Sequence, residues 1–217
     1  MKKILLLLLA VLTMGGCGGT AQDKTSAEPD KVASADKMPV ASAAGKKILI
    51  AYFSRTGEEY NVGTITRGNT AIVADFIAQK TGADVFEIKP VAPYPDDYNA
   101  CTELAKRELE SNARPALANK LDNLAQYDTI FLGYPIWWGK MPMIVYTFLE
   151  SGDFGGKKII PFCTHGGSGL AGTEHDLGKI CPNAKVLSGL AIVGKRAQND
   201  SAGVQKDVNQ WLSGLGY

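Results

Sequence analysis

The sequence predicts an α/β domain with a five-stranded parallel sheet and helices on both faces. Apolar runs that resemble strands alternate with helical segments five times between residues 46 and 217, which is the pattern of a parallel sheet. The runs are nearly continuous in apolar residues, as expected for strands covered on both faces. Since crossovers are right-handed, few topologies remain, and five strands suit a doubly wound, three-layer α/β/α fold in the order 2-1-3-4-5.

The first half of this pattern begins with "KILIAYF" (47–53), a near-continuous apolar run that predicts the first strand. In 69–82, Ile72, Val73, Phe76 and Ile77 recur at helical spacing, and a glycine follows as a stop signal. "DVFEIKP" (84–90) predicts the second strand, which ends at its proline. Residues 96–112 predict a helix with Asp96 or Asp97 as N-cap.

The second half continues the alternation. "TIFLGYP" (129–135) predicts the third strand, and the helix 142–150 after it opens with Pro142, which the first turn tolerates. "KIIPFCT" (158–164) predicts the fourth strand, followed by a glycine-rich loop and the helix 171–180. "KVLSGLAI" (185–192) predicts the fifth strand. A terminal helix, 201–216, carries Trp211 on its apolar face.

The N-terminal residues have the organisation of an export signal. A basic start precedes the nine-residue apolar run "ILLLLLAVL", which is too short to span a bilayer, and small residues follow up to Cys17, as in a secretory signal peptide. "MGGC" resembles the lipobox of bacterial lipoproteins, which implies that Cys17 is lipidated and anchors an exported protein on the extracytoplasmic side. The alternative is an ordinary cleaved signal. Residues 18–45 lack large apolar side chains and predict a disordered tether to the domain at 46–217.

Charge and cysteine content argue against a nucleic-acid-binding protein and against a disulfide-stabilised fold. Removing the five lysines and four acidic residues of positions 1–45 from the 23 Lys+Arg and 22 Asp+Glu of the chain leaves 18 of each sign. A neutral domain without a basic stripe argues against a nucleic-acid partner. Cys101, Cys163 and Cys181 form an odd set once Cys17 is lipidated, so no disulfide framework is indicated. We expect Cys163 to be a buried small hydrophobe.

In a doubly wound sheet the binding loops follow strands 1, 3 and 4. The first of these loops places Ser54, Thr56, Asn69 and Thr70 around a helix start, where free N–H groups and the helix dipole suit a phosphate. Plain helix capping is the alternative. Because no Walker lysine is present, the loop is not a P-loop of the NTPase kind.

The second loop carries Trp137 and Trp138 side by side in "PIWWGKMP". Paired aromatic residues usually fill a core or an interface. At the carboxyl end of a strand, however, a flat apolar side chain can stack on a planar ligand, which contributes about 0.5–1.5 kcal/mol beyond area burial. We expect one ring to stack on a flat cofactor and the other to cover the helix or the rim of the cleft.

The third loop, "THGGSGLAG", offers glycines that permit close backbone approach to a ligand. A hydrolase is a weaker interpretation, because Leu170 replaces the last glycine of the G-x-S-x-G elbow around Ser168. A metal site from Cys163, His165 and His175 has no recognised spacing. We expect His175 to be a solvated helix residue.

Together these motifs resemble those of the flavodoxin family over nearly all of residues 46–217. "AYFSRTG" with a delayed "GNT" resembles the family's phosphate loop, opened by an excursion from Glu58 to Arg67; "GYPIWWGKMP" and "PFCTHGGSG" resemble its two flavin-contacting loops. The resemblance implies an FMN cofactor. The implied cofactor-binding residues are Ser54, Arg55, Thr56, Gly57, Asn69, Thr70, Pro135, Ile136, Trp137, Trp138, Gly139, Thr164, His165, Gly166, Gly167, Ser168 and Gly169.

Two departures shape the function that this resemblance implies. The domain is neutral, whereas electron-carrier flavodoxins are usually acidic, and the loop 164–169 lacks the stacking aromatic residue that many flavodoxins carry. The expected function is a membrane-tethered electron carrier, with a redox protein or a quinone as partner. An FMN-dependent NAD(P)H/quinone reductase is the enzymatic alternative, and a non-redox binding module on an empty fold is the third.

Overall fold

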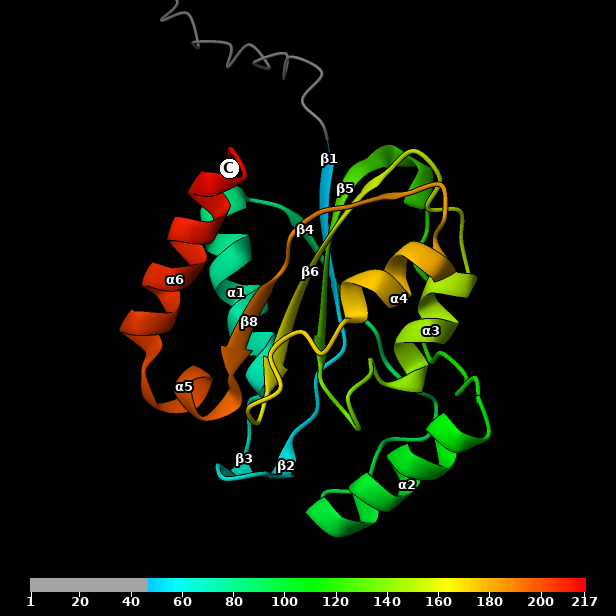
Figure 1. The fold of residues 1–217 in the computed structure, drawn as a ribbon, viewed down its shortest axis with the longest axis vertical. Helices are drawn as coiled ribbons and strands as arrows, with labels where there is room; N and C mark the ends of the chain where they lie inside the picture. The colour runs from blue at the N-terminus through cyan, green and yellow to red at the C-terminus, as the bar shows by residue number, and fades with distance from the viewer. Residues whose placement is uncertain (1–46) are drawn as a thin grey trace, which may run out of the picture. The chain divides into compact units, whose positions relative to one another are not determined.

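The structure is a computed structural model that describes residues 47–217. The strands of its main sheet are β1 (Lys47–Tyr52), β4 (Asp84–Glu87), β5 (Tyr127–Pro135), β6 (Lys158–His165), β7 (Lys185–Val186) and β8 (Leu190–Val193). They run in the order β4–β1–β5–β6, with β7 and β8 both parallel to β6 (Figure 1). This order confirms the predicted 2-1-3-4-5 topology of the doubly wound fold.

Helices cover both faces of the sheet. They are α1 (Asn69–Thr81), α2 (Tyr98–Glu110), α3 (Met143–Glu150), α4 (Thr173–Ile180), α5 (Gly194–Asn199) and α6 (Ser201–Gly214), with a 3-10 turn η1 at Leu124–Gln126. In Figure 1, α1, α5 and α6 lie on one side of the sheet and α3 and α4 on the other. Of the two candidate caps of α2, Asp97 is the N-cap: its carboxylate accepts from the Ala100 N–H at 2.7 Å.

Each face of the sheet has its own buried cluster, as the strand pattern predicts. Along β1, Leu49 and Ala51 join the cluster beneath α3 and α4, while Ile50 and Tyr52 join the cluster beneath α1 and α6. The alternation follows from the two-residue repeat of a strand. Burial on both faces explains why the strands lack a polar side. Trp211 packs against the second cluster from α6.

The fifth strand differs from the single run predicted at 185–192. It is divided into β7 and β8, and the register against β6 shifts by one residue between the pairs Ile159↔Val186 and Phe162↔Leu190. Pro161 of β6 lies at this point, and proline has no N–H to donate to a ladder. A side chain at Gly189 would lie 2.7 Å from the Pro161 carbonyl oxygen, so glycine is required beside the break.

The excursion from Glu58 to Arg67 forms a hairpin that the sequence pattern did not predict. Strands β2 (Gly57–Glu59) and β3 (Gly63–Ile65) pair in antiparallel fashion as a separate two-stranded sheet. The segment is too short, and too poor in apolar residues, to give a clear alternating pattern. The β2–β3 pairing makes the excursion an ordered element beside the first predicted binding loop.

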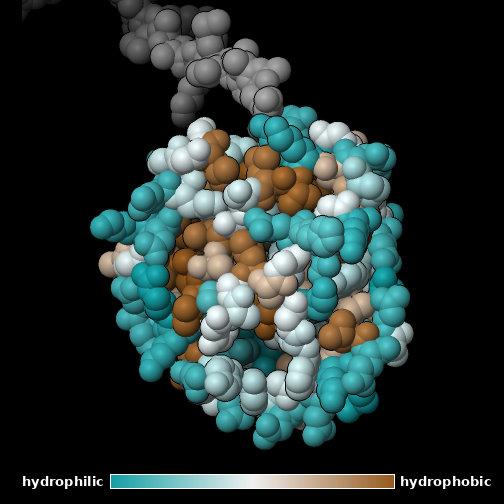
Figure 2. Space-filling view, in the orientation of Figure 1, coloured by the Kyte–Doolittle hydropathy of each residue, from teal (hydrophilic) through white to brown (hydrophobic). Residues whose placement is uncertain are grey.

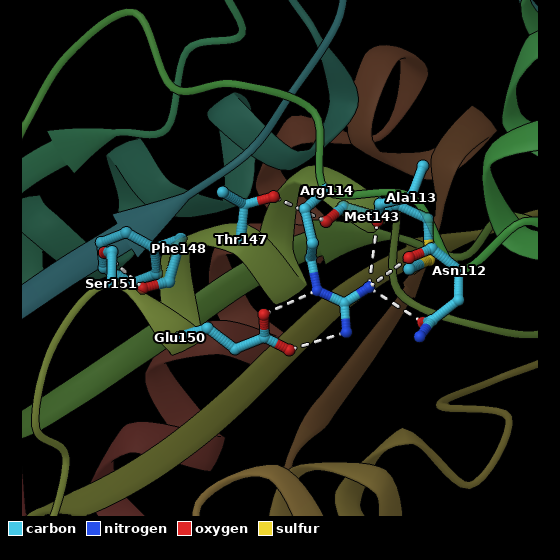
Figure 3. Close-up of polar contacts among 8 residues, drawn as sticks. All are labelled: Asn112, Ala113, Arg114, Met143, Thr147, Phe148, Glu150 and Ser151. Atoms are coloured by element: carbon cyan, nitrogen blue, oxygen red, sulfur yellow. Dashed lines mark hydrogen bonds and ion pairs between the residues drawn. The ribbon is translucent and has the colours of Figure 1, made fainter.

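A bidentate ion pair joins the segment after α2 to the end of α3 (Figure 3). The Arg114 Nε and Nη2 atoms each donate to a carboxylate oxygen of Glu150 at 2.7 Å. Its Nη1 atom donates to the carbonyl oxygens of Asn112 and Ala113, both at 3.0 Å. Paired donors of this kind fix orientation as well as distance, so the chain between α2 and β5 is held against α3.

The predicted signal peptide, Cys17 and the tether at 18–45 lie outside the described residues. Within residues 47–217, none of the helices is long and apolar enough to cross a bilayer.

Candidate functional site

A cleft of about 260 Å³ lies where the loops after β1, β5 and β6 meet. In Figure 2 the surface is hollowed in its lower half, where Figure 1 places the loops after β5 and β6 near the β2–β3 hairpin. The carboxyl ends of parallel strands share one edge, so three loops distant in sequence come together here. The predicted site residues that line the cleft are Arg55, Asn69, Pro135, Ile136, Trp137, Trp138, Thr164, His165 and Gly166.

At one end of the site, the N-terminus of α1 presents backbone donors. The N–H groups of Asn69 and Thr70 stand in the first turn and have no acceptor within the helix, as the geometry of an α-helix dictates. The Ser54 Oγ atom, in the loop after β1, accepts from the Ala71 N–H at 3.2 Å and so caps the first turn of α1. A Cβ on Gly68 would lie 2.1 Å from Ser54 Oγ, so only glycine allows the two segments to approach so closely.

The side chains of Asn69 and Thr70 are engaged in bonds within the protein. Thr70 Oγ1 lies 2.8 Å from Thr164 Oγ1, and both hydroxyls are buried. Asn69 Oδ1 accepts from Gln198 Nε2 at 2.8 Å, which ties α1 to α5. A Cβ on Gly194 would lie 2.8 Å from the side-chain Nδ2 atom of Asn69. Direct phosphate contact by these two side chains stays a prediction.

Arg55 holds the β2–β3 hairpin. Its Nη2 atom donates to the carbonyl oxygens of Glu58 at 2.7 Å and Asp96 at 2.9 Å, and Nη1 lies 3.4 Å from Glu59 Oε1. The Arg55 side chain is only 7% exposed, and its Nε atom is the one buried side-chain polar atom without a partner among the described residues. Burial raises the pKa of the Glu59 carboxyl, while the Arg55 guanidinium opposes that rise.

Thr56 and Gly57 lie at the base of the hairpin and do not line the cleft. Gly57 has a φ of 96°, and a side chain there would lie 2.7 Å from the Asp96 Cα atom. Its role is a close backbone crossing between the hairpin and the segment before α2. Contact of these two residues with a ligand stays a prediction.

The two tryptophans occupy the first two positions of one tight turn. Trp137 and Lys140 exchange two backbone hydrogen bonds of 2.9 Å, and Trp138 and Gly139 between them have φ values of 52° and 73°. Two positive φ angles define a type I′ turn. Gly139 suits the second central position of the turn. At the first central position, the left-handed backbone strains Trp138 by roughly 1 kcal/mol or more. Strain of this kind is concentrated at binding sites.

The two rings face different surroundings, as expected for neighbours in a turn. Trp137 makes edge contacts with Phe53 and Tyr94, at centroid distances of 5.4 and 4.9 Å. Trp138 is 55% exposed; its Nε1–H donates to the Thr102 carbonyl oxygen at 2.9 Å, so its ring lies over α2. Both rings line the cleft. Trp137 is held by packing, and Trp138 presents the larger accessible surface to a ligand.

The last residue of β6, His165, and Gly166 after it line the cleft, whereas Gly167, Ser168 and Gly169 lie beyond its lining. The His165 Nδ1 atom accepts from the Gly167 N–H at 3.0 Å. Burial lowers the pKa of His165, and Nδ1 must be unprotonated to accept this bond. A neutral imidazole therefore faces the cleft.

The geometry of this loop gives no support to the hydrolase interpretation or to the metal-site interpretation. Ser168 is exposed, and His175 is exposed on α4, as predicted. Cys163 is fully buried, and burial raises the pKa of its thiol to about 12. Within residues 47–217, no three His, Cys, Asp or Glu side chains are grouped closely enough to hold a metal ion.

Seven lining residues were not among the predicted site residues. One face of α2 supplies four of them, at helical spacing, and burial raises the pKa of the Cys101 thiol on that face to about 11. Their i, i+3, i+4, i+7 spacing is visible in the sequence, but it equally fits a face packed against the core. The residues missed are Glu59, Tyr60, Tyr98, Cys101, Thr102, Ala105 and Gly194.

Comparison with known proteins places this fold and cleft in a family. The profile of the flavodoxin family matches residues 47–212. The chain belongs to the flavodoxin family, which confirms the resemblance seen in the sequence. No protein of curated function matches the chain.

Solved structures agree with this assignment. A proposed flavoprotein of Bacteroides uniformis is 36% identical, with 78% of this chain and 99% of that chain covered and a TM-score of 0.63. One of Bacteroides eggerthii is 31% identical, with 80% and 99% covered and a TM-score of 0.64. A flavoprotein of Lactobacillus acidophilus, solved in complex with FMN, is 19% identical over 72% of this chain and 97% of that one, with a TM-score of 0.56. That last likeness shows the fold alone.

Proposed function

We propose that this chain binds FMN and transfers electrons as a carrier anchored to a membrane by a lipid on Cys17. The observation that carries the proposal is the placement of two features at one sheet edge. The backbone donors of α1 and the exposed ring of Trp138 meet at the same cleft, since Asn69 and Trp138 both line it. An FMN molecule needs an anion site and a flat apolar surface together. The FMN-bound structure of the same fold supports this choice.

The residues present fit the phosphate end of FMN. A Cβ on Gly68 would lie 2.1 Å from Ser54 Oγ, so the glycine lets Ser54 lie against the first turn of α1. The N–H groups of Asn69 and Thr70 and the Ser54 hydroxyl would hold the phosphate. Trp138 and the loop 164–169 would hold the ring. When bound, FMN would supply one- or two-electron chemistry, and the chain itself supplies binding, orientation and exclusion of water.

Colour is the first test of the proposal. The purified full chain is expected to be yellow and to release FMN on denaturation. A colourless product that takes up no added FMN would favour the non-redox binding module.

The carrier function is tested by electron transfer to an acceptor. Dithionite-reduced protein is expected to reduce ferricytochrome c, while NADH or NADPH with a soluble quinone should give no more turnover than free FMN. Saturable turnover with these substrates, well above that of free FMN, would overturn the carrier function in favour of the reductase.

Anchoring by Cys17 is tested separately. Only the thiol of this residue can take the diacylglyceryl group at the predicted lipobox, and two or more lipid chains hold a protein firmly on a membrane. The Cys17→Ser variant is expected in the soluble fraction, or with its signal uncleaved. Normal processing with membrane retention in that variant would contradict the anchor.

A further inference from the structure

Tyr60, at the turn of the β2–β3 hairpin, contacts a loop that lies about a hundred residues later in the chain. A Cβ on Gly166 would lie 2.9 Å from Tyr60 Cδ1 and 3.3 Å from its Cε1 atom, so the ring rests on the Gly166 backbone. Tyr60 lines the cleft and is 54% exposed. The hairpin therefore reaches from the first binding loop to the third.

The position of the hairpin is fixed by a set of contacts to the start of α2. Besides the two bonds from Arg55, the Glu58 N–H donates to the Asp96 carbonyl oxygen at 2.8 Å, and the Glu58 carboxylate accepts from the Tyr98 N–H at 3.2 Å. The buried Arg55 guanidinium lies 3.4 Å from Glu59, directly before Tyr60. Hydrogen bonds to charged groups are about twice as strong as neutral ones. Tyr60 thus stands on an anchored element.

The surroundings of Tyr60 suit a planar ligand. The loop 164–169 contains no phenylalanine, tyrosine or tryptophan. The Tyr60 ring, which belongs to the hairpin, lies against the Gly166 backbone of this loop. The Tyr98 ring lies 6.1 Å away at an interplanar angle of 31°. With Trp138, these rings line a cleft to which the third loop contributes His165 and Gly166.

We propose that Tyr60 is a cofactor-contacting residue: its ring packs against the flavin of bound FMN on the side of the loop after β6, and it limits access of a second reactant to that face. The inference rests on the proposed function, because it assumes that FMN occupies the cleft. It assigns a role to the excursion from Glu58 to Arg67, which supplies the aromatic ring that the loop 164–169 lacks.

The test is titration of the flavin-free full chain with FMN, followed by flavin fluorescence and by iodide quenching of the bound flavin. Loss of one stacking partner weakens binding about three- to tenfold. Tyr60→Ala and Tyr60→Leu are therefore expected to raise the FMN Kd by this factor and to increase iodide access. Tyr60→Phe, which keeps the ring, should behave as wild type. Val62→Ala in the same turn should also behave as wild type, which separates the ring from the integrity of the hairpin.

Tyr60→Leu keeps an apolar side chain, so it remains informative if Tyr60→Ala unfolds. Unchanged Kd and iodide access in Tyr60→Leu would overturn the inference while leaving FMN binding intact. Absence of FMN binding by wild type would overturn the proposed function and the inference together. Equal losses in Val62→Ala and Tyr60→Leu would assign the effect to the hairpin fold and would also overturn the role of the ring.

Discussion

The hydroxyl oxygens of Thr70 and Thr164 lie 2.8 Å apart, and both side chains are almost fully buried. This bond joins the first turn of α1 to the end of β6, and so connects two of the three loops that form the cleft. Its partners are far apart in the sequence, and each would be an unsatisfied buried group without the other.

Thr70→Val is expected to lower the free energy of unfolding by about 1–3 kcal/mol, because it leaves the Thr164 hydroxyl buried without its partner. Urea denaturation of wild type, both single variants and the double valine variant measures the coupling. The double variant should be more stable than the sum of the single losses predicts. Strictly additive losses would contradict a direct bond between the two hydroxyls.

Gly68→Ala is expected to abolish or strongly weaken FMN binding, because its Cβ would lie 2.1 Å from Ser54 Oγ and 2.4 Å from the Arg55 carbonyl oxygen. The loop must move, and the donors of α1 move with it. Gly178→Ala in α4 is the matched control, since nothing lies within 4 Å of its added Cβ; alanine there should be neutral or stabilise by about 0.5–1 kcal/mol. Fluorescence titration with FMN compares the two. Equal affinity in both variants would place the phosphate elsewhere.

Substitution of Trp137 is expected to affect mainly the stability of the fold, and substitution of Trp138 mainly the binding of FMN. Trp137→Ala should lower the free energy of unfolding by about 1–3 kcal/mol, because it removes the contacts of a partly buried ring with Phe53 and Tyr94. Trp138→Ala should cost less than about 1 kcal/mol of stability, since the ring is half exposed, but should weaken FMN binding and shift the flavin potential. Denaturation, FMN titration and redox titration distinguish the two. The reverse pattern would mean that Trp137 is the flavin partner.

His165 gives the site a pH dependence. Burial lowers its pKa from the ordinary 6.5, so the unfolded chain binds the proton first as pH falls, and the folded state loses stability below about pH 6.5. His165→Asn keeps an acceptor for the Gly167 N–H but cannot titrate, so this variant should lose less stability between pH 7 and 5 than wild type. Denaturation at stepped pH values checks this, and identical slopes for wild type and His165→Asn would refute it.

The architecture was predictable from the sequence because strands and helices alternate in a regular apolar pattern. The strand order followed from this alternation and the right-handed crossover rule, and Asp97 was one of two candidate caps of α2. The break in the fifth strand was not, because it arises from a missing N–H at Pro161 on the neighbouring strand. Pairing partners are a property of the tertiary fold and leave no mark in the run 185–192 itself.

The candidate site was predictable only in part, for a similar reason. The three loops follow strand ends, so their meeting could be inferred from topology alone. The orientation of Thr70 toward Thr164, the role of Arg55 in holding a hairpin and the arrival of Tyr60 over Gly166 depend on contacts between distant segments. No local pattern in the Glu58 to Arg67 excursion distinguishes a cleft wall from a solvated loop.

Phosphate binding at α1 is tested by calorimetric titrations of the flavin-free full chain with FMN and with riboflavin, which lacks the phosphate. We expect one FMN per chain, markedly weaker binding of riboflavin, and a Gly68→Ala variant in which that preference for FMN disappears. Absence of FMN binding, or equal affinity of wild type for FMN and riboflavin, would contradict a phosphate held at the N-terminus of α1.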